Sequence, residues 1–148
     1  MKKDYQLTRA GIKELEVELE ELIGKRREIA EKIKTAREFG DLSENAEYHA
    51  AMDEHQKTEA RIFEIEHIFK NVDIIDAPKN KDVVELGNTV TIKSDAGTKE
   101  FMVVGSVEAN PLENKISNQS PIGSALMGKK VGEVVKAGNT EYKVIKIS

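Results

Sequence analysis

Three carboxylate side chains recur at intervals of three residues in the N-terminal half of the chain: Asp41, Glu44 and Glu47. On the first turn of a helix this spacing places them on one side. Asp41 with Glu44 then forms an Asp variant of the capping box, and spacing alone favours this interpretation. The alternative is a metal site, because Mg²⁺ takes carboxylate oxygens and is often held by only one or two protein carboxylates. Such a site is incomplete and needs a partner to complete it.

The sequence on both sides of the acidic segment predicts the helices that must position it. Apolar residues recur in steps of three and four, the pattern of a heptad seam. We expect Thr8 to cap the first helix, Leu7 and Ile12 to form a hydrophobic staple, and Gly40 to end the helix. The seam of the first helix comprises Ile12, Leu15, Leu19, Leu22, Arg26, Ile29, Ile33 and Ala36, and that of the second comprises Tyr48, Ala51, His55, Thr58, Ile62, Ile65, Phe69 and Val72.

Folding the chain back at residues 41–43 brings every seam residue opposite another seam residue. Polar Arg26 then meets polar Thr58, and Leu19 meets Ile65. The sequence therefore predicts an antiparallel two-helix coiled coil, roughly 42 Å long from Ile12 to the turn. The seam changes from large aliphatic residues to Ala, Tyr and His towards the turn, so the outer half must depend on the turn and its caps.

The second half of the chain has the pattern of strands and turns. Ser120 and Pro121 mark the start of a short helix over 122–127, which Gly128 ends. Strands are expected at 89–92, 100–104, 132–135 and 142–147. The predicted fold class is α+β, with a coiled-coil hairpin over 1–76, a linker over 77–81, and a small antiparallel sheet domain with one short helix over 82–148.

Composition excludes several classes of protein. The 148 residues carry a net charge of −4, which argues against a broadly basic nucleic-acid binder. There is no cysteine, hence no disulfide or thiolate metal site. No run of about 18 apolar residues suggests a membrane span, and no signal segment is apparent, so we expect a cytoplasmic protein without membrane association.

The acidic segment Gly40-Asp41-Leu42-Ser43-Glu44-Asn45-Ala46-Glu47-Tyr48 closely resembles the turn of the bacterial Gre transcript-cleavage factors of the GreA type. The resemblance runs along the whole chain. Residues 104–109 and 116–123 look like the C-terminal domain of that family, which has an FKBP-like fold.

The resemblance implies a function and a mechanism. The hairpin would enter the secondary channel of RNA polymerase and reach the active centre of a backtracked complex, next to the 3′ end of the nascent RNA. Asp41 and Glu44 would be the catalytic residues, which help to hold the second Mg²⁺ of the polymerase without binding it stably on their own. The chain would be an accessory factor and not itself an enzyme, and we expect a monomer.

The resemblance also suggests supporting residues. Lys25 and Arg27 could contact RNA or the channel, although a solvated helix face with ion pairs four residues apart explains them equally simply. Met52 replaces a residue that is often basic in the family, which weakens the case for RNA contact there. The residues expected to support the turn are Arg37, Ser43, Asn45 and Glu47, and those expected to dock on polymerase are Ser120, Pro121, Ile122 and Gly123.

Two rival functions remain at this stage. The first is a channel-binding inhibitor of the anti-Gre type, against which the intact acidic turn argues. The second is a coiled-coil adaptor without chemistry. Prolyl isomerase activity is not expected, because residues 81–148 contain only Phe101 and Tyr142 as aromatics. The spacing of the three histidines does not suggest zinc.

Overall fold

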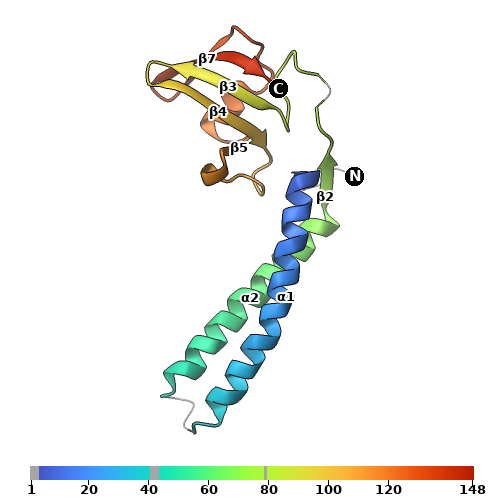
Figure 1. Ribbon diagram of the computed structural model, residues 1–148, viewed down its shortest axis with the longest axis vertical. Coiled ribbons are helices and arrows are strands. Elements are labelled where there is room, and N and C mark those ends of the chain that lie inside the picture. Colours follow the sequence, from blue (N-terminus) through green and yellow to red (C-terminus); the bar gives the residue numbers. More distant parts are fainter. Residues whose placement is uncertain (1–3, 41–43, 79) are drawn as a thin grey trace. The chain divides into compact units, whose positions relative to one another are not determined.

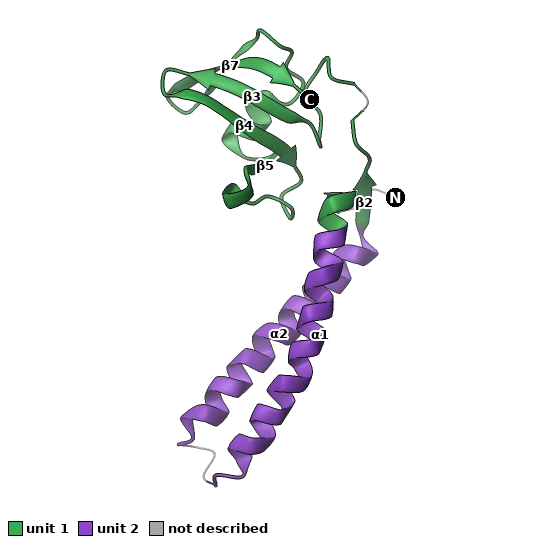
Figure 2. Ribbon diagram, in the orientation of Figure 1, with its two compact units in different colours: residues 1–12, 72–148 green, residues 13–71 purple. Residues whose placement is uncertain are grey.

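A computed structural model describes residues 4–40, 44–78 and 80–148 of the protein (Figure 1). The chain forms two compact units (Figure 2). Unit 1 contains residues 1–12 and 72–148, and unit 2 contains residues 13–71. Helix α1 (Arg9–Arg37) begins in unit 1 and continues through unit 2, and helix α2 (Ala46–Lys70) lies within unit 2. The α+β fold class predicted from the sequence is confirmed.

Unit 2 is the predicted helical hairpin, and its seam follows the predicted steps over most of its length. The buried residues of the seam are Leu15, Ile29 and Ala36 on α1 and Ala51, Thr58, Ile62 and Ile65 on α2. At the end of α2 the prediction is wrong: Ile68 is fully buried while Phe69 is only half-buried. Val72 lies beyond the helix in a strand.

Three ion pairs join the two helices next to the seam. Arg26 Nε lies 2.7 Å from Glu59 Oε1, and Glu59 is the neighbour of Thr58, the predicted partner of Arg26. Lys32 Nζ lies 3.3 Å from Glu54 Oε2. Arg61 forms a two-pronged contact with Glu18, at 2.7 Å and 2.9 Å. The first two pairs lie within two positions of the predicted register, whereas Arg61 lies five positions from Glu66, the residue predicted to face Glu18.

The first end of α1 is as expected, and the second departs slightly from expectation. Thr8 Oγ1 accepts the backbone N–H of Gly11 at 3.1 Å, which confirms Thr8 as the cap. At the other end α1 stops at Arg37, and residues 38–40 continue as a turn. Gly40 has φ +104°, a left-handed conformation that favours glycine.

Unit 1 contains a two-stranded ribbon that the sequence did not predict. Strand β1 (Tyr5–Thr8) pairs in parallel with β2 (Val72–Ile75), and Tyr5 faces Val72 in the register. The exposed ion pair of Arg9 and Asp76, at 2.9 Å, lies just beyond the ribbon. Because β1 joins β2, the first twelve residues belong to the same unit as the C-terminal sheet rather than to the hairpin.

The remainder of unit 1 is a five-stranded sheet with the order β5-β4-β3-β7-β6. Neighbouring strands are antiparallel except β4 and β5, which are parallel. The strands are β3 (Thr89–Ser94), β4 (Gly97–Val104), β5 (Lys115–Ser117), β6 (Val134–Ala137) and β7 (Thr140–Ile147). A single turn of 3-10 helix, η1 (Pro111–Glu113), precedes β5, and helix α3 (Pro121–Leu126) follows it.

The core of this sheet domain lies between the sheet and α3. Its buried residues are Val84, Val90, Ile92, Val103, Leu126, Val135, Val144 and Ile147. The predicted strands β3, β4 and β7 and the helix α3 are present. The predicted strand at 132–135 is displaced to Val134–Ala137, and β5 was not predicted.

The pair of Glu18 and Arg61 gives the hairpin a dependence on pH. The hydrogen bonds from Arg61 hold the pKa of Glu18 below its ordinary value, against the opposing effect of partial burial. A lowered pKa in the folded state means that the pair stabilises the fold above the ordinary carboxyl pKa. This stabilisation is lost as the pH falls through the lowered value.

We therefore predict that acidification from pH 7 to pH 3 lowers the free energy of unfolding more in the wild type than in Glu18→Gln. The difference should stay below about 1 kcal/mol, because both side chains are more than a third exposed and screened by solvent. Urea unfolding followed by circular dichroism at the two pH values measures it. Parallel losses in the two proteins would show that the ion pair contributes nothing.

Candidate functional site

The acidic turn joins α1 to α2, and part of it falls outside the described residues. Asp41, Leu42 and Ser43 are among those not described, so the catalytic role of Asp41 and the supporting role of Ser43 stay predictions. Glu44 and Gly40 border this gap, and both are exposed.

Asn45 connects the two helices at the turn. Its Oδ1 accepts the backbone N–H of Tyr48 at 3.1 Å, which makes Asn45 the N-cap of α2. Its Nδ2 donates to the carbonyl oxygen of Ala36 on α1 at 2.8 Å. One side-chain amide thus bonds a backbone donor of one helix and a backbone acceptor of the other, and the Ala36 carbonyl also accepts the N–H of Phe39 at 3.2 Å.

This cap corrects the capping-box interpretation of the acidic residues. With Asn45 as N-cap, Glu44 precedes the helix and does not occupy the third helical position that a capping box requires. Only Glu47 lies in the first turn of α2, where a negative charge is favoured by the helix dipole. The sequence signal for Asn45 was present, since asparagine is among the preferred N-cap residues, but the regular spacing of the acids concealed it.

The basic residue nearest the turn is held by an aromatic ring. The guanidinium carbon of Arg37 lies 5.9 Å from the centre of the Tyr48 ring, within the range of a cation–π contact. The His49 ring packs edge-on against Tyr48, with centroids 5.7 Å apart. Arg37 at the end of α1 and Tyr48 at the start of α2 are therefore brought together, as Asn45 and Ala36 are.

A hollow of about 460 Å³ opens between the helices behind the turn. Its floor includes the buried residues Ala36 and Ala51, whose small side chains do not fill the space between the helices. Glutamates line much of it, among them Glu47. The predicted weakening of the seam towards the turn is thus visible as empty volume.

Lys25 and Arg27 are exposed on α1. Their neighbours Arg26 and Lys32 pair across the hairpin, as described above. The proposed contact of Lys25 and Arg27 with RNA or the channel stays a prediction, and Met52 is half-buried on α2.

The four residues expected to dock on polymerase all lie at the start of α3. Ser120 Oγ caps this helix by accepting the N–H of Gly123 at 3.1 Å, and Pro121 occupies the first helical position. Gly123 is buried, and a Cβ there would overlap the carbonyl oxygen of Ser117. Ile122 packs against the core. Docking stays a prediction, with Pro121 and the exposed Ser124 as the accessible part of this segment.

Among residues 4–40, 44–78 and 80–148, no three His, Asp or Glu side chains gather as metal ligands. No helix within these ranges combines the length and apolar character needed to cross a membrane.

A helical hairpin with an acidic turn, followed by a small sheet domain, is the architecture of a class of transcription elongation factors, and comparison with known families agrees. Residues 5–74 match the family described as "Transcription elongation factor, N-terminal", and residues 79–148 match "Transcription elongation factor, GreA/GreB, C-term". The chain belongs to the GreA/GreB family, as its resemblance to Gre factors indicated.

Two GreA relatives support the same assignment. The chain is 49% identical to the transcription elongation factor GreA of Clostridium acetobutylicum, over 98% of this chain and 97% of that protein. It is 48% identical to GreA of Macrococcus caseolyticus, over 100% and 99% of the two chains. Among solved structures, GreA factor homolog 1 of Thermus thermophilus is 30% identical, with 99% of both chains covered and a TM-score of 0.47.

The bridging position of Asn45 leads to a prediction about the outer half of the hairpin. Asn45→Ala removes both hydrogen bonds and should destabilise the hairpin by about 0.5–2 kcal/mol, the range for losing an N-cap. Asn45→Asp keeps an equally good cap but replaces the donor to Ala36 with a carboxylate, so it should fall between Asn45→Ala and the wild type. Urea unfolding of the two variants measures both effects.

Gln56→Ala, at an exposed position in the middle of α2, is the matched control and should change stability by less than about 0.5 kcal/mol. Equal stability of Asn45→Asp and the wild type would mean that the bond to Ala36 contributes nothing.

Proposed function

We propose that this elongation factor stimulates a backtracked RNA polymerase to cleave its own nascent transcript, and so rescues arrested complexes. Its family works with RNA polymerase, and both family segments are present along nearly the full chain. The observation that carries the proposal is the assignment of the α2 cap to Asn45. Because an amide performs the capping, the exposed Glu44 carboxylate is left for a ligand outside the chain.

We further propose that the hairpin enters the secondary channel and brings Asp41 and Glu44 to the Mg²⁺ of the polymerase active centre. Carboxylate oxygens suit Mg²⁺, and one or two of them can complete an octahedron whose other positions are filled by other groups. When bound, the second ion would stabilise the attacking or leaving oxygen in phosphodiester hydrolysis. The two acids supply ligands only, so the catalytic centre remains that of the polymerase.

Several finer features belong to the same proposal. The chain acts as an accessory factor without nuclease activity of its own, because two carboxylates are too few to hold the metal alone. It works as a monomer in the cytoplasm, on the 3′ end of the backtracked RNA. Arg37 and Glu47 support the turn, and the start of α3 docks on polymerase.

The rival functions differ in what the acids must do. An inhibitor of the anti-Gre type needs to occupy the channel but needs no metal ligand. An adaptor needs the acids only as caps, and the cap of α2 is Asn45. The adaptor hypothesis explains Glu44 only as a helix cap, and Asn45 already fills that role. The assignment of the cap to Asn45 therefore favours the cleavage factor.

The first prediction from this function concerns charge at the turn. Asp41→Asn and Glu44→Gln should each reduce stimulated cleavage by more than the roughly 10–100-fold expected for losing an outer-shell partner of a metal site. Both substitutions preserve size and remove only the negative charge. Cleavage of 3′-labelled transcript in stalled complexes with Mg²⁺ measures the effect, alongside polymerase binding.

Glu38→Gln, which removes a charge from the exposed turn after α1, is the control and should stimulate cleavage by polymerase as well as the wild type does. Full activity of Glu44→Gln with unchanged binding would refute the metal role of this residue. RNA cleavage by the isolated factor would refute its description as an accessory protein.

The second prediction concerns reach. Deleting residues 19–25 from α1 and 59–65 from α2 removes one heptad from each helix and preserves the steps of the seam. The turn then lies about 10 Å closer to the base of the hairpin, whereas a ligand of Mg²⁺ must lie within roughly 2.1 Å of the ion. The shortened factor should compete with the intact factor for polymerase and stimulate no cleavage. Helicity by circular dichroism verifies folding, and undiminished cleavage by a folded variant would exclude delivery to a fixed site.

A further inference from the structure

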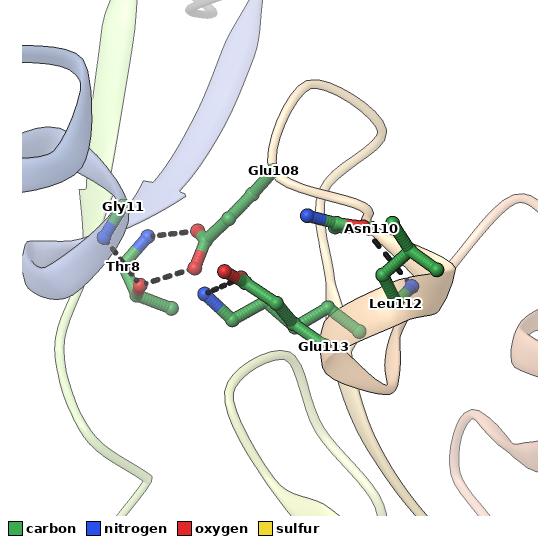
Figure 3. A network of polar contacts seen from close by, with 7 residues as sticks. Thr8, Gly11, Glu108, Asn110, Leu112 and Glu113 are labelled. Atoms are coloured by element: carbon green, nitrogen blue, oxygen red, sulfur yellow. Dashed lines mark hydrogen bonds and ion pairs between the residues drawn. The ribbon is translucent and has the colours of Figure 1, made fainter. Parts of the chain in front are cut away.

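Unit 1 contains a buried carboxylate that the proposed chemistry does not use. Glu108 follows β4, its side chain is 8% exposed, and it faces the start of α1 (Figure 3). Its two oxygens accept the backbone N–H of Thr8 at 2.9 Å and the Thr8 hydroxyl at 2.6 Å. The same hydroxyl oxygen accepts the N–H of Gly11. Glu108, Thr8 and Gly11 therefore form one continuous hydrogen-bonded chain, with the charge of Glu108 at its end.

Packing against Glu108, and not helix propensity, explains the glycine at position 11. Glycine is one of the poorest helix formers, yet Gly11 lies in the first turn of a 29-residue helix. A Cβ at this position would lie 2.5 Å from the carboxyl carbon and one carboxylate oxygen of Glu108. Gly24, in the middle of the same helix, would meet nothing within 4 Å. The missing side chain of Gly11 thus makes room for the Glu108 carboxylate.

The turn that carries Glu108 is itself pressed against β1. The N–H of Glu108 donates to the carbonyl of Gly105 at 3.0 Å, which closes the turn. A Cβ on Gly105 would overlap the backbone carbonyl oxygen of Gln6 in β1. Two glycines therefore permit close approach on the two sides of Thr8. Gly105 lets its turn approach Gln6 in β1, before Thr8, and Gly11 lets Glu108 approach α1, after Thr8.

These contacts act on the segment through which unit 1 connects to the hairpin. The chain crosses between the units only at residues 12–13 and 71–72, and the pairing of β1 with β2 joins these crossings within unit 1. Helix α1 is continuous from the Glu108 contact into unit 2. A group that holds the first turn of α1 therefore acts on the residues from which the rest of the helix extends.

We propose that Glu108 is a positioning residue for transcript cleavage, acting through Thr8 and the first turn of α1. The proposal rests on the cleavage function argued above. A metal ligand at the turn works only within a narrow range of positions, and a misplacement of 1 Å can cost about 10²-fold in rate. Restraint at the base of a long helix limits the displacement at its far end. Glu108 would thus affect the rate at saturation and not the affinity for polymerase.

The experiment compares Gly11→Ala with Gly24→Ala. Both variants make the same chemical change in α1, but only the first displaces the Glu108 carboxylate. Gly11→Ala should lower the maximal rate of stimulated cleavage at least about 10-fold, with the half-saturating concentration changed less than about 2-fold. Gly24→Ala should match the wild type. Glu108→Ala should behave like Gly11→Ala, and Glu108→Gln, which retains an acceptor for Thr8 N–H, should recover part of the rate.

A second measurement tests the restraint without reference to cleavage. The chain has no cysteine, so spin labels can be placed at two introduced cysteines, Lys57→Cys on α2 and Lys99→Cys on β4. The distribution of distances between the labels should be wider in Gly11→Ala and Glu108→Ala than in the wild type and Gly24→Ala. If Gly11→Ala does not fold, the maximal rate of stimulated cleavage and the label distances are both measured on Glu108→Gln.

The outcomes separate the two proposals. A wild type that fails to stimulate cleavage refutes the proposed function. The label distances alone then show whether Glu108 restrains the first turn of α1. Unchanged distributions in Gly11→Ala and Glu108→Ala refute positioning by Glu108. Equal maximal rates for Gly11→Ala and Gly24→Ala, in the presence of an active wild type, refute its part in cleavage.

Discussion

A hairpin of two helices has no third layer, so each helix can bury only a narrow stripe, and the hairpin must be fastened at its ends. In this protein hydrogen bonds to backbone groups hold the two helices together at both ends. At the base, β1 pairs with β2, and the chain segments that enter and leave the hairpin become neighbouring strands. At the turn, Asn45 caps α2 through its Oδ1 and donates through its Nδ2 to the carbonyl oxygen of Ala36 at the end of α1. Between these points the seam shrinks to alanine towards the turn, and the space left there stays open.

The use of an amide at the turn has a consequence for its chemistry. A carboxylate that caps a helix is already engaged by backbone N–H groups and is a poorer ligand for an external cation. Asn45 provides the cap without charge, and Glu44 stands outside the helix next to it. The cation–π contact of Arg37 with Tyr48 holds the nearest basic group against a ring at the start of α2. In the proposed mechanism, helix capping and metal binding at the turn would thus belong to different side chains.

The elements that were predictable from the sequence are those whose signals are local. The heptad steps, the Thr8 cap and the Ser120-Pro121 helix start each depend on residues within one or two turns. The β1–β2 ribbon was missed because four-residue strands more than sixty positions apart leave no periodic signal, and Leu7 was interpreted as part of a staple. The contact of Glu108 with Thr8 spans one hundred positions and could not be inferred from either segment. For the site, the roles of Asp41 and Glu44 suggested by the family resemblance stay predictions, and spacing assigned the cap of α2 to the wrong side chain.

The ion pairs between the helices contribute to specificity more than to stability. Exposed pairs of this kind are worth only about 0.2–1 kcal/mol each. A heptad seam, however, permits slippage by seven residues, because the same steps recur. Slippage in one direction would replace the Glu18–Arg61 pair with Glu18 opposite Glu54, and slippage in the other would place Lys32 opposite Arg61 instead of Glu54. Like charges therefore meet in either direction. The pairs along the hairpin thereby favour the observed register of α1 against α2.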